Sequence, residues 1–120
     1  MPRTDVVYFR EEDGSVPVLE WLDQMPPKVR DKFLVRIERL EECGFELRRP
    51  EAAHLRDGVY ELRVRHQNVH YRVLYFFACQ KAVLSHGLTK EKEVPAKEIE
   101  NALMRCDRFG EDPEQHTHLE

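Results

Sequence analysis

Hydrophobic residues recur at helical spacing near the start of the chain. Residues 5–10, which precede them, are rich in β-branched and aromatic side chains and predict a first strand. A short amphipathic helix is then predicted over residues 16–25, with Ser15 as its N-cap. A second, longer helix is predicted to begin near Pro27 and to end at Gly44, because glycine favours a helix C-terminus.

Apolar and polar residues alternate over the middle of the chain, which is typical of β-strands. Residues 45–54 have no clear period and are interpreted as a linker. The alternation then runs through residues 58–77, where Gln67 and Asn68 suit a two-residue hairpin turn. Residues 81–88 predict a third strand of the same meander.

The end of the chain predicts one more helix. Residues 89–94 are a charged loop, and Pro95 opens a segment with helical periodicity. Residues 110–120 are acidic and lack periodicity, so a disordered tail is expected after a single domain over residues 1–109. The complete order predicts a small α+β fold, in which two N-terminal helices and a C-terminal helix pack against a twisted, mostly antiparallel sheet.

The hairpin places two arginines side by side. With a two-residue turn, Arg63 lies directly opposite Arg72, and one face of the hairpin is core, with the aromatic residues Tyr60, Tyr71 and Tyr75. The other face carries Glu61, Arg63, Arg65, His70 and Arg72 near the turn, followed by Leu74 and Phe76. Like charges directly opposite each other destabilise a strand pair, so an anion such as a phosphate between the arginines would explain them. The alternative is a pair of surface arginines whose charge is balanced by Glu61 and nearby carboxylates.

Composition and charge limit the functional classes. The 120 residues carry a formal net charge of −4, which argues against a generally basic nucleic-acid binder. Residues 54–92 nevertheless carry a net +4, so the positive charge lies around the arginine pair, unless this distribution is chance. No stretch is long and apolar enough for a membrane span or a signal peptide. The three cysteines are widely spaced and suggest reduced thiols of a cytoplasmic protein.

Four pieces of the sequence, in their order, resemble the RelE superfamily of toxins from bacterial toxin–antitoxin pairs, in its HigB-like, phage-derived branch. These pieces are residues 55–63, 71–76, 83–92 and 94–105. The resemblance covers roughly residues 5–108 and implies a RelE-like fold. It also implies a ribosome-dependent endoribonuclease that cuts mRNA, silenced by a cognate helix-turn-helix antitoxin, with operator DNA contacted only through that antitoxin.

The resemblance assigns the chemistry to Arg63, Arg72, Lys90 and Lys92. Metal-free RNA cleavage needs a proton acceptor, a proton donor and stabilisation of the phosphorane, and arginine suits the last of these. His86 is a candidate general acid or base, with a structural histidine as the alternative. A two-residue turn at Gln80 and Lys81 would put His86 on the core face, and a three-residue turn would put it on the arginine side. Weaker candidates are His54, His70, Asp107 and Arg108.

The sequence indicates no cofactor and no metal site. His116 and His118 lie in the expected tail without a second cluster, and a glycine-rich phosphate loop is absent from the sequence. Trp21 is interpreted as a packing or antitoxin-contact residue. Two alternatives to the toxin remain: a non-catalytic RelE-fold protein that acts with an antitoxin as transcriptional co-repressor, and an orphan that binds RNA or protein.

Overall fold

The computed structural model describes residues 3–89 and 92–120, and the predicted order of elements recurs in it with additions. Its elements, with one 3₁₀ turn (η1), are β1 (Asp5–Phe9), α1 (Pro17–Asp23), α2 (Pro27–Cys43), η1 (Gly44–Glu46), β2 (Ala52–Arg56), β3 (Val59–His66), β4 (Val69–Ala78), β5 (Lys81–Thr89), α3 (Ala96–Glu111) and β6 (Thr117–His118).

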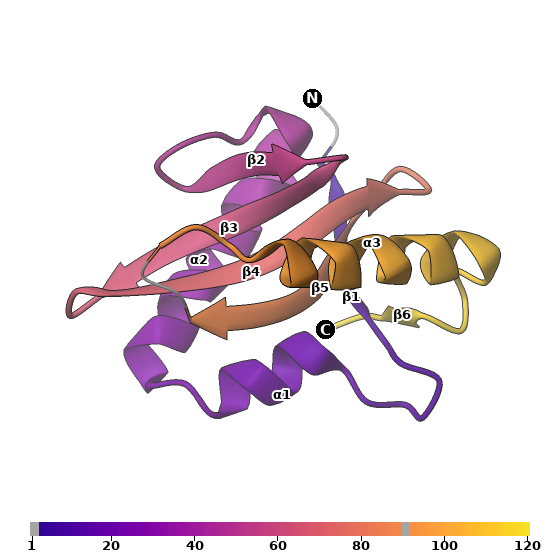
Figure 1. The fold of residues 1–120 in the computed structure, drawn as a ribbon, viewed down its shortest axis with the longest axis horizontal. Coiled ribbons are helices and arrows are strands. Elements are labelled where there is room, and N and C mark those ends of the chain that lie inside the picture. The colour runs from indigo at the N-terminus through magenta and orange to yellow at the C-terminus, as the bar shows by residue number, and fades with distance from the viewer. Residues whose placement is uncertain (1–2, 90–91) are drawn as a thin grey trace.

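Within the described residues, six strands form one sheet in the order β2-β3-β4-β5-β1-β6. β1 runs parallel to β5, and the other neighbours are antiparallel. α3 crosses one face of the sheet, while α2 lies behind it and α1 borders the same far side (Figure 1). The predicted small α+β fold with a mostly antiparallel sheet is therefore confirmed, and it is consistent with a RelE-like fold.

Apolar side chains fill both sides of the sheet. On the side of α1 and α2, Phe33 and Leu40 pack with Leu62 and Tyr75, all of them buried. The predicted tyrosine row belongs to this core, because Tyr60 and Tyr71 pack against the same cluster. On the other side, α3 covers Leu74 and Phe76 with the residues Ile99, Ala102 and Phe109. The apolar end of the arginine-bearing face is thus closed by α3.

The predicted hairpin register is confirmed. Arg63 pairs with Arg72 across β3 and β4, and the turn residues Gln67 and Asn68 have φ of 50° and 65°. Two successive residues with positive φ give the type I′ turn that matches strand twist, and asparagine tolerates this conformation better than most residues. The turn chemistry therefore determines which residues face each other.

The linker expected over residues 45–54 is wrong in its second half, because Ala52–Arg56 form β2. This segment contains two alanines and no β-branched residue, so its own strand propensity is low. It forms a strand because it pairs with β3, with Ala52 opposite Leu62, and both residues are fully buried. Tertiary pairing has overridden local propensity here.

Ser15 is not the N-cap of α1, as was expected. Val16 occupies that position with φ −121° and ψ 97°, and the Ser15 hydroxyl donates to Asp13 Oδ1 at 2.7 Å. The cause is Pro17 at the first helical position, because a residue before proline is held in the extended region. Glu20 Oε2 accepts a hydrogen bond from the Val16 N–H at 3.2 Å instead.

The tail expected to be disordered over residues 110–120 is ordered in the structure. α3 continues to Glu111, and Thr117 and His118 pair with β1 as β6. The His116 ring stacks on Phe9 at 4.8 Å and its Nδ1 donates to the Arg10 carbonyl at 2.7 Å. The exposed edge of β1 supplies these partners, which sequence periodicity does not reveal.

The turn between β4 and β5 is Cys79 and Gln80, not the expected Gln80 and Lys81. The register shifts by one residue at Ser85, which is left without a partner in β4. Beyond this bulge His86 lies opposite Leu74, as the three-residue alternative had it. A bulge and a different turn position together place His86 on the face covered by α3.

We expect Gly87→Ala to lower the free energy of unfolding by about 1–3 kcal/mol, the usual cost of overpacking. A Cβ at Gly87 would lie 2.2 Å from the Trp21 ring, which packs edge-on against Phe33 and Tyr71. Urea unfolding measures the effect. The matched control is Gly110→Ala in α3, where the new Cβ meets nothing within 4 Å. Alanine should stabilise a helix by about 0.5–1 kcal/mol there. Equal stability of the two variants would contradict the packing role of Gly87.

Candidate functional site

A carboxylate, Glu61, lies between the paired arginines. Its Oε1 is 2.9 Å from Arg72 Nε, and its Oε2 is 3.9 Å from Arg63 Nε. Glu61 is only 4% exposed. The protein itself therefore supplies an anion to the arginine pair, as the surface-pair alternative had it, and the opposition of two arginines does not by itself require a phosphate.

The two arginines share a face as expected, but they differ in exposure. The side chain of Arg63 is 25% exposed, whereas that of Arg72 is only 10% exposed, so Arg63 is the more accessible of the two to a ligand. Besides its ion pair with Glu61, Arg72 Nη1 donates to the Lys92 carbonyl, on the segment that leads to α3. This segment covers Arg72. The alternation of residues along a strand does not predict that contact.

Burial and ionic contacts act in opposite directions on Glu61. Burial raises the pKa of its carboxyl group, while the positive charges of Arg72, Arg63 and Arg49 oppose that rise, and the net direction is upward. The Arg72 guanidinium is thus the closest positive charge that compensates the buried Glu61 carboxylate.

We expect Arg72→Ala to lower the free energy of unfolding by about 3–5 kcal/mol, because it leaves the buried Glu61 carboxylate without its closest cation. Urea denaturation at neutral pH measures the loss. The double variant Glu61→Gln with Arg72→Ala removes the uncompensated charge and should recover a large part of it. A single variant as stable as the wild type would show that the ion pair contributes nothing.

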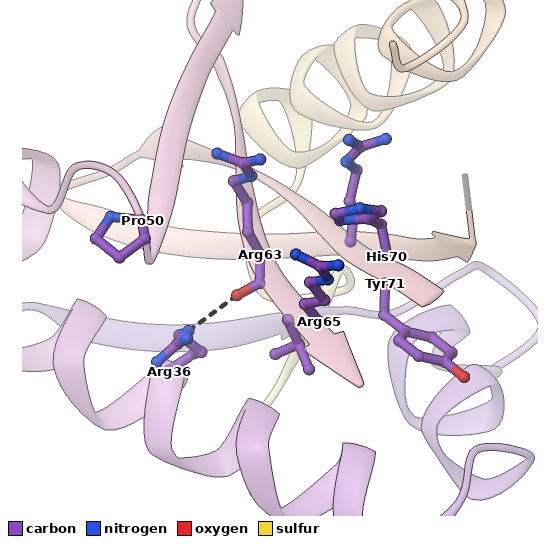
Figure 2. Close-up of a pocket in the computed structure, with 8 residues that line it drawn as sticks. Arg36, Pro50, Arg63, Arg65, His70 and Tyr71 are labelled. Carbon is purple, nitrogen blue, oxygen red and sulfur yellow. Dashed lines mark hydrogen bonds between the residues drawn. The ribbon is translucent and has the colours of Figure 1, made fainter. Parts of the chain in front are cut away.

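A pocket of about 240 Å³ opens beside the arginine pair and is rich in cations. We call it the basic pocket; its described lining consists of Arg36, Pro50, Arg63, Val64, Arg65, His70, Tyr71 and Arg72. None of these described residues is acidic. Figure 2 shows Arg63 and Arg65 projecting to the same side as His70, while the Tyr71 ring points away. This arrangement suits an anionic ligand.

Two side chains of α2 reach the edge of β3, and one of them, Arg36, lines the basic pocket. β2 ends its pairing at Leu62, so the β3 carbonyls beyond it need other partners. Arg36 Nε donates to the Arg63 carbonyl at 2.9 Å, and Lys32 Nζ donates to the Arg65 carbonyl at 3.2 Å (Figure 2 shows the first). These side chains lie four residues apart on one helix face, so α2 both protects the strand edge and adds positive charge there.

A second pocket, of about 300 Å³, lies on the other side of the arginine pair. We call it the mixed pocket, because it combines apolar, basic and acidic side chains. Its described lining consists of Arg49, Leu55, Arg56, Glu61, Arg63, Arg72, Glu93, Val94 and Ile99. Arg63 and Arg72 line both pockets and form the wall between them.

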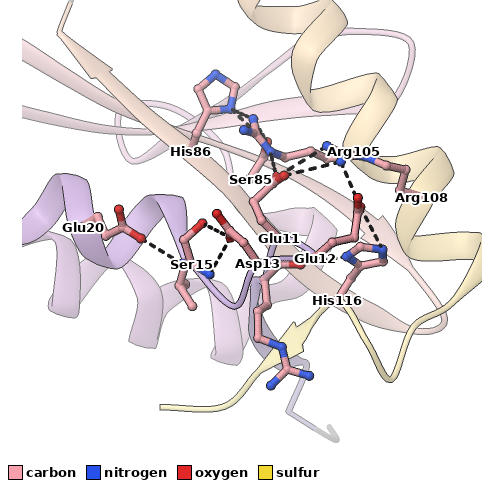
Figure 3. A network of polar contacts seen from close by, with 12 residues as sticks. Glu11, Glu12, Asp13, Ser15, Glu20, Ser85, His86, Arg105, Arg108 and His116 are labelled. Carbon is pink, nitrogen blue, oxygen red and sulfur yellow. Dashed lines mark hydrogen bonds and ion pairs between the residues drawn. The ribbon is translucent and has the colours of Figure 1, made fainter.

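His86 belongs to a different polar network, under α3 (Figure 3). Arg105 Nη1 lies 3.1 Å from His86 Nδ1, and Glu98 Oε1 lies 3.2 Å from His86 Nε2. Because arginine can only donate, Nδ1 accepts and the Nε2–H of a neutral imidazole donates to Glu98. Burial and then the charge of Arg105 lower the pKa of His86, while Glu98 opposes them. The described lining of neither pocket includes His86, so the structure does not bring it to the arginine pair.

This network predicts a pH dependence of stability. In the folded state the pKa of His86 lies below its ordinary value of 6.5, which the unfolded chain retains. At a pH between the lowered pKa and 6.5, the unfolded chain therefore binds more protons than the folded protein. Stability should therefore fall as the pH drops below 6.5, by up to ~1.4 kcal/mol per pH unit from this residue. Urea unfolding from pH 7.5 to 5.5 measures the slope. His86→Gln should flatten it, whereas His54→Gln, at an exposed position, should keep the wild-type slope. An unchanged slope in His86→Gln would refute the assignment.

The remaining sequence candidates are scattered. Lys92 is exposed and presents its carbonyl to Arg72, while Lys90 lies outside the described residues. His70 lines the basic pocket. His54 packs edge-on against Tyr60, and Asp107 is exposed on α3. Arg108 pairs with Glu11 and Glu12, near Arg105, which ties α3 to the loop after β1 (Figure 3).

Sequence reasoning missed Arg36 as a site residue and underestimated Glu61. Nothing in the periodicity of α2 shows that its Arg36 meets the β3 edge, although the spacing of Lys32 and Arg36 on one face was a readable signal. The burial of Glu61 involves α3 and the segment before it, which lie about thirty or more residues after Glu61 in the sequence. Trp21 packs against the core and edge-on against Phe33, which agrees with one of its two interpretations, while the antitoxin contact stays a prediction.

Within residues 3–89 and 92–120, no group of three or more histidine, cysteine, aspartate or glutamate side chains is placed to hold a metal ion. The helices in these ranges are all too short or too polar to cross a membrane.

Comparison with known proteins identifies a family. The family model described as "Phage derived protein Gp49-like (DUF891)" matches residues 20–107, a range that contains α2, the whole hairpin and both pockets. No curated protein matches the chain. Because the match spans most of the fold, the chain belongs to the phage-derived Gp49-like family.

Proposed function

We propose that this protein is the toxin of a toxin–antitoxin pair, a RelE superfamily member of the HigB-like branch that cleaves mRNA on the ribosome without a metal ion. The basic pocket carries this proposal: four arginines and a histidine from three elements line one hollow, and none of its described lining residues is acidic. A phosphodiester is an anion that arginine forks recognise well. Membership of a phage-derived family supports the same assignment.

The proposed chemistry is attack of a ribose 2′-hydroxyl, which loses its proton, on the adjacent phosphate. The P–O5′ bond then breaks, the 5′-oxygen leaves with a proton, and a 2′,3′-cyclic phosphate remains on the other fragment. Arg63, which is partly exposed between the two pockets, stabilises the charge of the phosphorane. Arg72 orders this site through its ion pair with Glu61 and contributes positive charge to the same wall. Lys92 adds a contact to the RNA backbone, and the family resemblance assigns the same role to Lys90.

Proton transfer is assigned by position. His70 lies in the basic pocket beside the arginines, so it is placed to exchange a proton with bound RNA. His86 was the first candidate, but its imidazole is engaged by Ser85, Glu98 and Arg105 beneath α3. In this proposal His86 acts as a positioning residue for α3, and His70 takes the acid–base role.

The partners follow from the toxin assignment. They are mRNA on the ribosome in the cytoplasm, and a helix-turn-helix antitoxin that alone contacts operator DNA. Induced expression should arrest growth, and cleaved mRNA ends should map within translated codons. A short neighbouring open reading frame that encodes a helix-turn-helix protein would be the matching antitoxin.

A second candidate is a non-catalytic protein of the same fold that acts with an antitoxin as transcriptional co-repressor. The observation that favours it is Glu61, which supplies an anion to the arginine pair without any RNA. This candidate predicts no growth arrest and no new mRNA ends on induction, together with tighter binding of the antitoxin to its operator when the protein is present.

A further inference from the structure

The basic pocket extends along the strands beyond the arginine pair. Arg65 and His70 form the next pair on the same face, two residues from Arg63 and Arg72 along each strand. Residues two apart in a strand are separated by roughly 7 Å. The hairpin therefore presents two rows of basic side chains, with Arg36 of α2 at their edge.

The additional cations are held in place and retain donors for a ligand. Arg65 Nη2 donates to Asn68 Oδ1 at 2.9 Å, and Arg36 is fixed through Nε to the Arg63 carbonyl at 2.9 Å. Each contact engages one nitrogen of a guanidinium that has five N–H donors. Preorganised side chains of this kind lose little conformational entropy when an anion binds.

The acidic residues lie on the opposite side of the arginine wall. Glu61 and Glu93 line the mixed pocket, whereas none of the described residues of the basic pocket is acidic. Glu51 approaches Arg36 Nη1 at 3.8 Å from outside the pocket and pairs more closely with Arg39, at 3.0 Å. A second anion bound in the basic pocket would therefore meet no carboxylate in the described lining, although Arg36 would share its charge with Glu51.

We propose that Arg36, Arg65 and His70 form a second phosphate-binding subsite, so that the protein holds two successive phosphates of one RNA strand. The first phosphate lies at Arg63, and the next lies one strand row away. This inference rests on the proposed function for the identity of the ligand as single-stranded RNA. It adds that recognition of the strand depends on α2 and the hairpin tip, as well as on the arginine pair.

The test counts phosphates through the salt dependence of binding. The probe is a fluorescent single-stranded RNA of eight nucleotides with 2′-O-methyl groups, which cannot be cleaved because the attacking hydroxyl is blocked. For single strands, the logarithm of the binding constant falls with the logarithm of salt concentration by about 0.7 for each phosphate neutralised. Anisotropy titrations between about 50 and 200 mM salt give this slope for each variant.

Arg65→Gln and Arg63→Gln should each reduce the magnitude of the slope by about 0.7, and the double variant should reduce it by about twice as much. Additivity is the signature of two different phosphates. The control is Lys97→Gln, an equal change of charge at an exposed position of α3, which should leave the slope unchanged. Matching thermal unfolding curves confirm that the variants remain folded, as expected for the exposed Arg65.

Three results would overturn the subsite: a double variant with the slope of either single variant, an Arg65→Gln slope equal to that of the wild type, or no binding by the wild type at low salt. Because the probe cannot be cleaved, the slopes are independent of catalysis. A protein that shows additive slopes but leaves mRNA intact on ribosomes would retain the subsite and lose the proposed nuclease activity.

Discussion

Purified protein should cleave mRNA on programmed ribosomes and leave the same naked RNA largely intact. The site holds cations that stabilise a phosphorane, but His70 is the one histidine in the described lining of the basic pocket, so acid–base groups are sparse. Such a site depends on an outside scaffold that fixes the reactive geometry of the RNA. Positioning of this kind can supply ~7–11 kcal/mol of the activation barrier.

The charge of the chain supports the same expectation. The net charge is −4, and the central segment, residues 54–92, carries +4. A charge of this size gives only weak electrostatic attraction to RNA in solution. Cleaved ends are mapped by primer extension with and without ribosomes at equal protein concentration. Equal rates in the two reactions would refute the ribosome-dependent mechanism. Intact mRNA in both, from a folded sample, would favour the co-repressor.

Arg63→Gln should reduce cleavage on the ribosome on the order of 10²-fold or more, because it removes a preorganised donor from the developing phosphorane charge. Position 63 is suitable for testing the chemical step separately from folding. Arg63 is partly exposed, and its nearest carboxylate oxygen is 3.9 Å away, so its loss disturbs Glu61 less than loss of Arg72. Single-turnover cleavage at saturating ribosome concentration separates the chemical step from binding.

Two further variants make this result interpretable. Lys97→Gln, with the same change of charge on the exposed side of α3, should cleave at the wild-type rate. Arg72→Lys keeps a cation near Glu61 but loses the guanidinium fork, so it should fold and yet cleave slowly. An Arg63→Gln protein that cleaves as fast as the wild type would move phosphorane stabilisation to another residue.

The arginine pair shows how far local sequence information reaches. The alternation of residues 58–77 and the Gln67-Asn68 turn predicted the register, because the side-chain period of a strand is two and a two-residue turn leaves no freedom in pairing. The longer helix, its Gly44 C-terminus and the tyrosine core were predictable for a similar reason. Helical and strand periods depend only on residues that are close together in the sequence.

Contacts between distant segments were beyond this reasoning. β2 is a strand only because β3 lies beside it, and β6 forms only because β1 has an available edge. The bulge at Ser85 decides that His86 lies beneath α3, and periodicity cannot reveal one extra residue in a strand.

The character of the candidate site was decided in the same way. Sequence determined that Arg63 and Arg72 are neighbours on one face, because that relation depends on a single turn. Only the tertiary structure decided that Glu61 is buried between them, that Arg72 is covered, and that Arg36 joins Arg65 and His70 in one pocket. Burial and electrostatic environment depend on which elements pack over a side chain, and α2 and α3 reach the hairpin from opposite ends of the chain.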